Sequence, residues 1–262
     1  MTDPAIDPEP QAAVDTPPGT VGTPQGAPIP EVPAVEPAAE VASITLGEIQ
    51  PDPQLSLYIA SADRVMDAMG YTEHGFRHAH LVGKIAYQVL RRLDFSQREA
   101  ELARVAGYLH DIGNALGRDG HGQSGAILAH QVLRDRADGV DLMTIMAAIA
   151  NHEETEGTAV SPVSAAVILA DKADVHRSRV RRPNEADLTR DIHDRVNYAV
   201  EQSFLRVDSD ARTVSLELTI DTQISQVMEY FEIFLGRMQM CRHAAEAIDA
   251  RFQLFANGQE LA

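Results

Sequence analysis

The chain has 262 residues, 44% of them hydrophobic, so it can bury a large core, and one main domain is expected. Its formal net charge is -17, of which the first 50 residues contribute -8 and the remaining residues -9. Because so acidic a body repels a phosphate backbone, a broad surface for duplex nucleic acid is excluded. The single cysteine, Cys241, excludes an intrachain disulfide and a metal site built from several cysteines.

Residues 1–50 are predicted to be a disordered acidic tail rich in proline and alanine. They hold ten of the 14 prolines, eight acidic residues and no lysine or arginine, so they cannot bury enough apolar surface to offset the entropy lost on ordering. The acidic start lacks the basic and apolar segments of a signal peptide, and no run of about 18 apolar residues follows. A cytoplasmic protein without a membrane partner is therefore expected.

Residues 51–203 are predicted to form a helical domain. Ser96 and Glu99 have the spacing of a capping box, and Ser161-Pro162 suits a helix cap followed by proline at the first helical position. Apolar periodicity together with such signals predicts helices over residues 60–69, 77–93, 97–109, 121–136, 141–151, 161–181 and 187–202.

Residues 204–262 have a different pattern. Over 212–220 apolar and polar residues alternate, as in a half-buried strand, and the preceding turn suggests 204–207 as its hairpin partner. A long helix over about 222–249 is apolar on several sides, so it packs on the helical domain or joins two copies in a homodimer, and a short strand and turn follow it. The sequence thus predicts a mainly α fold, a helical bundle with a small C-terminal β-hairpin and a long C-terminal helix.

His110 and Asp111 close an apolar helical run and are the most informative residues for function. An imidazole and a carboxylate side by side supply nitrogen and oxygen ligands to one metal ion, and the carboxylate can bridge to a second. Since such a pair occurs by chance in many chains, the argument depends on companion residues.

Helical periodicity selects companions among the other histidines. His78 shares its helix face with apolar residues, whereas His80 points to solvent, and His74 precedes this helix and could lie nearby. His121 begins a helix just after a glycine-bearing loop, while His130 projects to nearly the opposite side of that helix.

His152 and Asp171 complete the candidate set. His152 follows the apolar side of the helix that ends there, and Asp171 shares a helix face with apolar residues. A buried carboxylate is costly unless it is paired, protonated or bound to metal. Asp174 follows three residues later and could orient a ligand, hold a water or donate a proton.

Together these residues resemble the core of the HD-domain superfamily, helical metal-dependent phosphohydrolases named for their His-Asp pair. The resemblance covers about residues 71–182 and includes HGFRHAHLVGKIA, GYLHDIGN, HGQSGAILAHQVL, IMAAIANHEE and ILADKADV. The metal residues that it implies are His78, His110, Asp111 and Asp171 for the core site, and His121 and His152 for the second ion of members with two metals. The chain lacks the Gly-Tyr-Pro signature of the cyclic dinucleotide phosphodiesterases of this group, which argues against that substrate.

The resulting hypothesis is a phosphohydrolase that cleaves a phosphoester in a nucleotide or another small phosphorylated molecule. The ligand types favour two divalent transition ions, Mn or Fe, over Mg alone, and Zn, Co or Ni would also fit. Asp111 would bridge the two ions, and a metal-activated water would attack the phosphorus. The predicted catalytic residues are Asp111 and Asp174.

A cluster of basic residues follows the last predicted metal ligand. The predicted substrate-binding cations are Lys172, Arg177 and Arg181, and Arg179 and Arg182 lie among them. In an acidic body such a cluster could bind a phosphate, although a salt-bridged helix end has the same pattern.

Two other functions stay open at this stage. A di-iron oxygenase of the same fold would consume dioxygen and show iron-dependent spectra. A nucleotide-binding regulatory module would bind its ligand tightly with little turnover, and its tail, C-terminal hairpin and C-terminal helix would be interaction elements.

Overall fold

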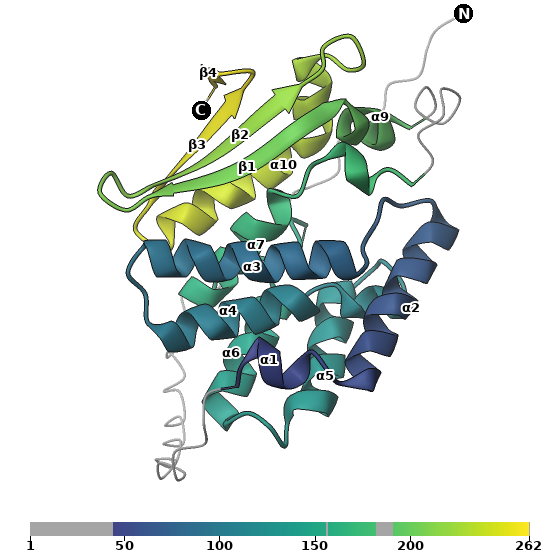
Figure 1. The fold of residues 1–262 in the computed structure, drawn as a ribbon, viewed down its shortest axis with the longest axis vertical. Coiled ribbons are helices and arrows are strands. Elements are labelled where there is room, and N and C mark those ends of the chain that lie inside the picture. Colours follow the sequence, from purple (N-terminus) through teal and green to yellow (C-terminus); the bar gives the residue numbers. More distant parts are fainter. Residues whose placement is uncertain (1–43, 156, 182–190, 262) are drawn as a thin grey trace, which may run out of the picture. The chain divides into compact units, whose positions relative to one another are not determined.

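The structure is a computed structural model that describes residues 44–155, 157–181 and 191–261 (Figure 1). The first part of the chain forms the helices α1 (Leu46–Ile49), α2 (Pro53–Met69), α3 (Phe76–Arg92), α4 (Gln97–Leu109), α5 (His121–Leu133), α6 (Gly139–Ala150) and α7 (Pro162–Lys172), with short 3-10 helices η1 (Ile112–Ala115) and η2 (Arg177–Arg179). The C-terminal part adds α9 (Ile192–Ala199), β1 (Val200–Asp208), β2 (Thr213–Ile220), α10 (Val227–Glu246), β3 (Arg251–Ala256) and β4 (Gln259–Glu260). The predicted mainly α fold class is confirmed.

Helices α3 and α4 cross closely at two glycines. A Cβ on Gly83 would lie 2.7 Å from the carbonyl oxygen of Arg104, and a Cβ on Gly107 would lie 3.0 Å from the Cα of Gly83. Larger side chains would push the helices apart, so the crossing depends on glycine at both positions. This contact places His78 on α3 near His110, which follows α4 directly.

The segment after α4 packs just as closely on α5. A Cβ on Gly113 in η1 would overlap the carbonyl oxygen of His121 and would lie 2.5 Å from the backbone nitrogen of Gly125. The glycine-bearing loop between η1 and α5 therefore returns the chain to the His-Asp pair, and it brings the first residue of α5 beside Asp111.

The helix caps follow the sequence signals. Ser96 and Glu99 form the predicted capping box of α4, and the Ser161 side chain accepts a hydrogen bond from the backbone of Ser164 in α7. The start of α2 lies earlier than predicted, because the side chain of Asp52 caps that helix and Pro53 occupies its first position.

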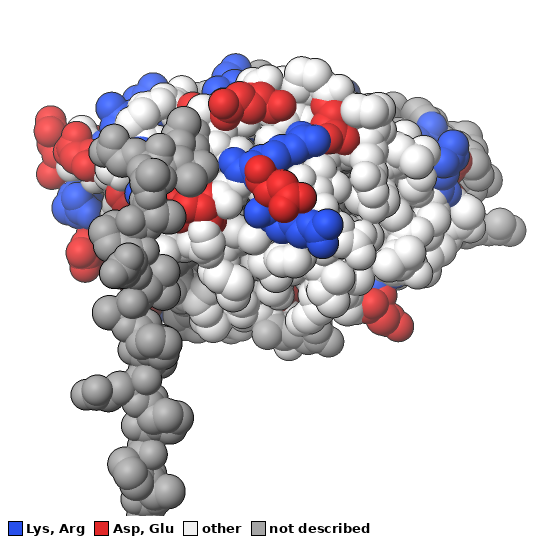
Figure 2. Space-filling view, turned by 90° about the horizontal axis from the view of Figure 1, so that it is seen from below, with Lys and Arg blue, Asp and Glu red and all other residues white. Residues whose placement is uncertain are grey.

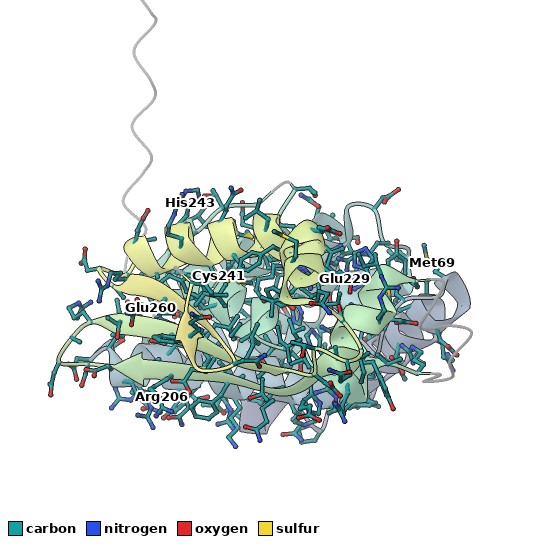
Figure 3. All side chains as sticks on the ribbon, turned by 90° about the horizontal axis from the view of Figure 1, so that it is seen from above. Met69, Arg206, Glu229, Cys241, His243 and Glu260 are labelled. Atoms are coloured by element: carbon teal, nitrogen blue, oxygen red, sulfur yellow. The ribbon has the colours of Figure 1, made fainter. Side chains whose placement is uncertain are left out.

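The C-terminal strands form one sheet in the order β1-β2-β3-β4. Strand β1 pairs antiparallel with β2 as the predicted hairpin, but β3 returns after α10 to pair parallel with β2, and β4 pairs antiparallel with β3. The predicted hairpin is thus part of a four-stranded sheet. Helix α10 packs against both β3 and α7, which joins the sheet to the helical body, as predicted for this helix. Figure 3 shows Arg206 of β1 at one edge of this layer and Cys241 of α10 on the opposite side.

The predicted tail boundary at residue 50 is wrong. Ile44, Leu46 and Ile49 are buried in the core, so the last residues of the predicted tail form α1 and belong to the helical body. Apolar burial offsets the ordering entropy at these positions. Residues 1–43, the rest of the predicted tail, lie outside the described residues.

Two predicted helices are too long. The helix predicted over 161–181 ends at Lys172, because the side chain of Asp174 bonds to α3 and the hydroxyl of Ser203 donates to the carbonyl oxygen of Ala173 at 2.6 Å. The helix predicted over 187–202 is α9, and β1 replaces its end from Val200, four residues before the predicted domain boundary. Residues 182–190 lie outside the described residues.

Charged residues on the face seen in Figure 2 lie in small groups of opposite sign within a largely uncharged surface. Exposed apolar side chains of the helical body include Ile127 on α5 and Val140 and Met143 on α6. Among the described helices, none has the length and apolar character needed to span a membrane.

Candidate metal centre

The residues predicted to bind metal come from separate elements and meet inside the helical body. They are His78 in α3, His110 and Asp111 at the junction of α4 and η1, His121 at the start of α5, His152 just after α6, and Asp171 near the end of α7. Their ligand atoms fall into groups of three that lie within 4.8 Å of one another. Such groups could each hold a metal ion.

The first group of side chains, called here the His78 half, surrounds the Nε2 atom of His78. This atom lies 3.1 Å from His110 Nε2, 3.4 Å from Asp111 Oδ2 and 3.3 Å from Asp171 Oδ1. His110 Nε2 lies 3.3 Å and 3.6 Å from the same two carboxylate oxygens, and its Nδ1 donates to the carbonyl oxygen of Gly107 at 2.8 Å.

The second group, called here the His121 half, gathers on the other oxygen of Asp111. His121 Nε2 and His152 Nε2 lie 3.5 Å and 3.8 Å from Asp111 Oδ1. Asn114 Nδ2 donates to the same oxygen at 2.8 Å. Asn114 Oδ1 is buried without a hydrogen-bond partner among the described residues, so it can accept a bond from a water or ligand at the centre.

The orientation of the imidazoles tests whether this half fits a metal. The Nδ1 atoms of His121 and His152 lie 2.9 Å and 2.7 Å from the carbonyl oxygens of Arg118 and Ile149. A carbonyl oxygen only accepts, so each Nδ1 carries a hydrogen and each Nε2 is the ring nitrogen that faces the centre. These two Nε2 atoms are 2.9 Å apart and both lie within 3.8 Å of Asp111 Oδ1, so a single cation could bind them together. The donors therefore fit a divalent metal ion.

Protonation differs between the two halves. Burial lowers the pKa of His78, but its bonds with the carboxylates of Asp111, Asp171 and Asp174 outweigh burial and raise that pKa to about 9. At His110 burial acts in the same direction, and Asp111 and Asp171 raise the pKa to about 10. Without metal, the His78 half therefore retains protons at neutral pH.

In the His121 half, burial affects the pKa of His121 more than the neighbouring charges do. It lowers the pKa of His121 to about 3, because the attraction of Asp111 offsets burial only partly and Arg118 adds a repulsion. His121 is thus neutral at pH 7 and presents a lone pair at Nε2, ready to bind a metal without losing a proton.

Asp174 holds the first histidine in place. Its Oδ2 accepts a bond from His78 Nδ1 at 2.7 Å, and Arg77 donates to both of its oxygens at 3.2 Å and 2.8 Å. Burial raises the pKa of Asp174, but these bonds and the charge of Arg179 outweigh burial and hold it well below its usual range. Because the carboxylate of Asp174 is ionised and accepts three hydrogen bonds, the predicted role of orienting a ligand is favoured over proton donation.

Lys172 is at the centre, but it is paired with protein carboxylates. Its Nζ lies 2.7 Å from Asp171 Oδ2 and 2.7 Å from Glu154 Oε2, and the side chain is almost fully buried. Arg237 of α10 donates to the other oxygen of Glu154 at 3.0 Å. Lys172 therefore holds Oδ2 of Asp171, which leaves Oδ1 of the same carboxylate facing His78. This role differs from the predicted binding of substrate.

The other two predicted substrate cations bond to protein groups as well. Arg177 lies in η2 and not on the helix of Asp171, and it donates to Glu201 of β1 at 3.0 Å. Arg181 donates to the carboxylate of Asp63 at 2.5 Å and to the carbonyl oxygen of Tyr71 at 3.0 Å. These bonds hold the segment after α7 against β1 and against α2. Arg182 lies outside the described residues.

Glu153 and Arg118 are polar neighbours of the centre that the sequence analysis missed. Glu153 Oε2 lies 3.4 Å from His121 Nε2 and accepts a bond from Arg118 at 2.9 Å. Both line a pocket of about 160 Å³ beside His121. The signal was local, because Glu153 directly follows His152 and Arg118 lies three residues before His121 in the same loop.

The remaining histidines of the region lie where the periodicity placed them. His80 is exposed and contacts Gln50 at 3.1 Å, and His130 is only half-buried. His74 lies beside His78, with 5.7 Å between the ring centroids, and its Nδ1 bonds to the carbonyl oxygen of Thr72. It borders the centre without being among the groups that could hold an ion.

Comparison with known proteins agrees with this geometry. Residues 75–182 match the family model of the HD domain. The chain is also 26% identical over 184 residues to the uncharacterized protein MJ1020 of Methanocaldococcus jannaschii, a match that covers 62% of this chain and 70% of that protein. The matched region contains every side chain of the candidate centre. Residues 75–182 therefore form an HD domain, the helical fold of a superfamily of metal-dependent hydrolases.

Proposed function

We propose that the protein is a phosphohydrolase with two divalent ions, which cleaves a phosphoester in a small phosphorylated molecule. The observation that carries this proposal is the position of Asp111. One carboxylate oxygen faces His78 and His110, and the other faces His121 and His152. A carboxylate with imidazoles on both sides is the arrangement expected for a ligand shared by two neighbouring ions.

In this proposal the protein ligands divide between the two ions. The first ion would be held by His78, His110, Asp111 and Asp171, and the second by Asp111, His121 and His152. Four imidazoles favour Mn or Fe over Mg, which prefers oxygen ligands and water. Two bound ions would lower the pKa of a water and neutralise charge on the phosphoryl oxygens.

The residues around the ligands have distinct tasks. Asp174 and Lys172 keep His78 and Asp171 in the orientation that metal binding needs. Glu153 is the carboxylate next to the His121 half, and burial raises its pKa despite the nearby cations. We assign to its Oε2 the proton that the attacking water loses, since a raised pKa favours proton uptake.

Arg118 is the cation best placed to bind the substrate. It reaches to 3.4 Å from His121 Nε2, and its side chain is one-fifth exposed in the pocket beside this histidine. A guanidinium can bind two phosphate oxygens at once, so Arg118 would orient a phosphoryl group over the His121 half. Arg118 would have to exchange its bond with Glu153 for one with the phosphoryl group, and the predicted cations Arg177 and Arg181 could take part only after leaving Glu201 and Asp63.

The test is release of phosphate or alcohol from a panel of phosphomonoesters and phosphodiesters by protein loaded with Mn or Fe. We expect turnover of at least one class without oxygen consumption, and loss of turnover in His110→Ala and Asp111→Ala. His130→Ala is the matched control, because it removes a histidine outside the centre. Equal turnover and metal content in all of these proteins would overturn the proposal. Oxygen consumption with iron and no phosphoester cleavage would favour the oxygenase instead.

A further inference from the structure

Strand β1 is an edge of the sheet, and its outer side is open. The carbonyl oxygen of Leu218 in β2 accepts a bond from Asn257 on the β3 side, so by alternation Leu216 also faces β3. Leu205 pairs with Leu216 in the register, and its backbone N–H and C=O therefore point away from β2. From Ser203 to Val207, no backbone hydrogen bond from the described residues reaches this outer side.

Strand β1 runs beside α3 (Figure 1). Residues of both elements line a groove of about 560 Å³ along this edge. Leu81 and Ile85 of α3 are half-buried on its helical wall, and Leu205 lies on its strand wall. Phe204 also lines the groove with 56% of its surface exposed. The apolar side chains of α3 therefore extend beyond the edge of the sheet at β1. A further strand added next to β1 would cover them.

The charge of the groove is opposite to that of the protein. Lys84 and Arg92 line it about two turns apart on α3, and within the described parts of the chain neither side chain forms an ion pair or hydrogen bond. Arg77 and Arg206 also line the groove, and both are paired, Arg77 with Glu73 and Asp174 and Arg206 with Glu217 across the hairpin. Figure 3 shows Arg206 at the edge of the sheet. The acidic lining residue is Asp174, which is bonded to His78 and Arg77. Unpaired cations in an acidic protein indicate an anionic partner.

We propose that the groove binds an extended acidic segment of a partner protein, which pairs with β1 as an additional strand. Its backbone would satisfy the open N–H and C=O groups of Ser203, Leu205 and Val207. Alternate apolar side chains would cover Leu81 and Ile85, and carboxylates between them would meet Lys84 and Arg92. Five residues of extended chain span roughly 16 Å, which matches the length of β1 along the groove.

The free strand edge favours a peptide over a small anion. A small anion would use the cations but would leave the row of backbone groups and the apolar wall without a partner. An extended peptide offers a donor and an acceptor at every second residue, at the same repeat as the strand.

The test is fluorescence anisotropy with a labelled hexapeptide of alternating glutamate and valine, added to the full chain at low salt. We expect binding that weakens by about tenfold or more in the double variant Lys84→Glu, Arg92→Glu, because both charges that attract the peptide are reversed. The control variant Arg64→Glu, Arg242→Glu makes the same change in net charge on other helices, and it should bind like the wild type.

Backbone pairing has its own control. Two further peptides of the same sequence carry N-methyl groups on alternate amides, one on the odd and one on the even residues. In one of the two, the methyl groups replace the N–H donors that face β1, so that peptide should not bind. Undiminished binding of both N-methylated peptides would show that no strand is added, and it would overturn the proposal. The same holds for equal affinity in the Lys84, Arg92 variant, or for no binding of the parent peptide up to about 1 mM. Loss of a dimer in that variant with no effect on the peptide would assign the groove to a second copy instead.

Discussion

The two halves of the candidate metal centre share Asp111 but differ in what surrounds them. The His78 half is enclosed by charged side chains that bond to its ligands, with Asp174 on His78 and Lys172 on Asp171. The His121 half is held by backbone carbonyl oxygens and borders a small pocket that contains Arg118. Under the proposed function, the first half would retain its ion and the second would be where substrate binds.

The largest effect is expected from the shared ligand. Asp111→Ala removes a ligand from both halves, so we expect loss of both ions and a fall in turnover of about 10³-fold or more. Metal analysis of purified protein together with phosphoester turnover measures both. Asp135→Ala, which removes an exposed carboxylate, is the control. Retention of two ions in Asp111→Ala would contradict the shared-ligand account.

Removing a ligand from one half should separate the two ions. In His152→Ala we expect the loss of one metal equivalent per chain and a fall in turnover of about 10²-fold, because the His78 half keeps all of its ligands. His130→Ala is the matched control. The comparison between the halves fails if His152→Ala loses both ions or neither of them.

The stability of the metal-free protein should depend on Lys172, the buried cation of the His78 half. Lys172→Met leaves Asp171 and Glu154 without their buried partner, so the free energy of unfolding of the metal-free protein should fall by about 3–5 kcal/mol. Urea denaturation measures this change, and Lys84→Met is a control on an exposed lysine. A change below about 1 kcal/mol would mean that the pair contributes little, as exposed pairs do.

Arg118 should affect substrate binding more than metal binding. In Arg118→Ala we expect KM to rise by about tenfold while both ions are retained, since a charge-assisted bond to phosphate contributes about 1.5–3 kcal/mol. Arg134→Ala, on an exposed arginine at the end of α5, is the control. An unchanged KM would remove Arg118 from the substrate site.

The smallest expected effect is a difference in proton release. In the metal-free protein the raised pKa values of His78 and His110, about 9 and about 10, stabilise the fold fully below pH 6.5, and this contribution is lost as the pH rises through those values. Metal binding to the His78 half at pH 7 should therefore release up to about two protons, whereas His121, with its lowered pKa, releases none. Calorimetric titration of metal in buffers with different ionisation enthalpies would detect the release. Binding without proton release would contradict this assignment.

The sequence predicts which side chains meet at the centre better than it predicts what surrounds them, for a physical reason. His78 and Asp171 occupy apolar helix faces, and that periodicity alone separates them from His80. The partners of Lys172 could not be predicted, because Glu154 and Arg237 are distant in the sequence and meet Lys172 only through packing of α7 with α10. The end of α7 could not be predicted either, because the bonds of Asp174 to α3 interrupt a helix that local propensity would continue. A short C-terminal strand was predicted, but its parallel pairing with β2 was not, because helix α10 separates the two strands in the sequence.

The most direct test of the central claim is a crystal structure of the protein with Mn, in which anomalous scattering locates the ions. We predict two peaks, one on each side of the Asp111 carboxylate, the first against His78, His110 and Asp171 and the second against His121 and His152. A single peak, or two peaks that do not share Asp111, would contradict the account.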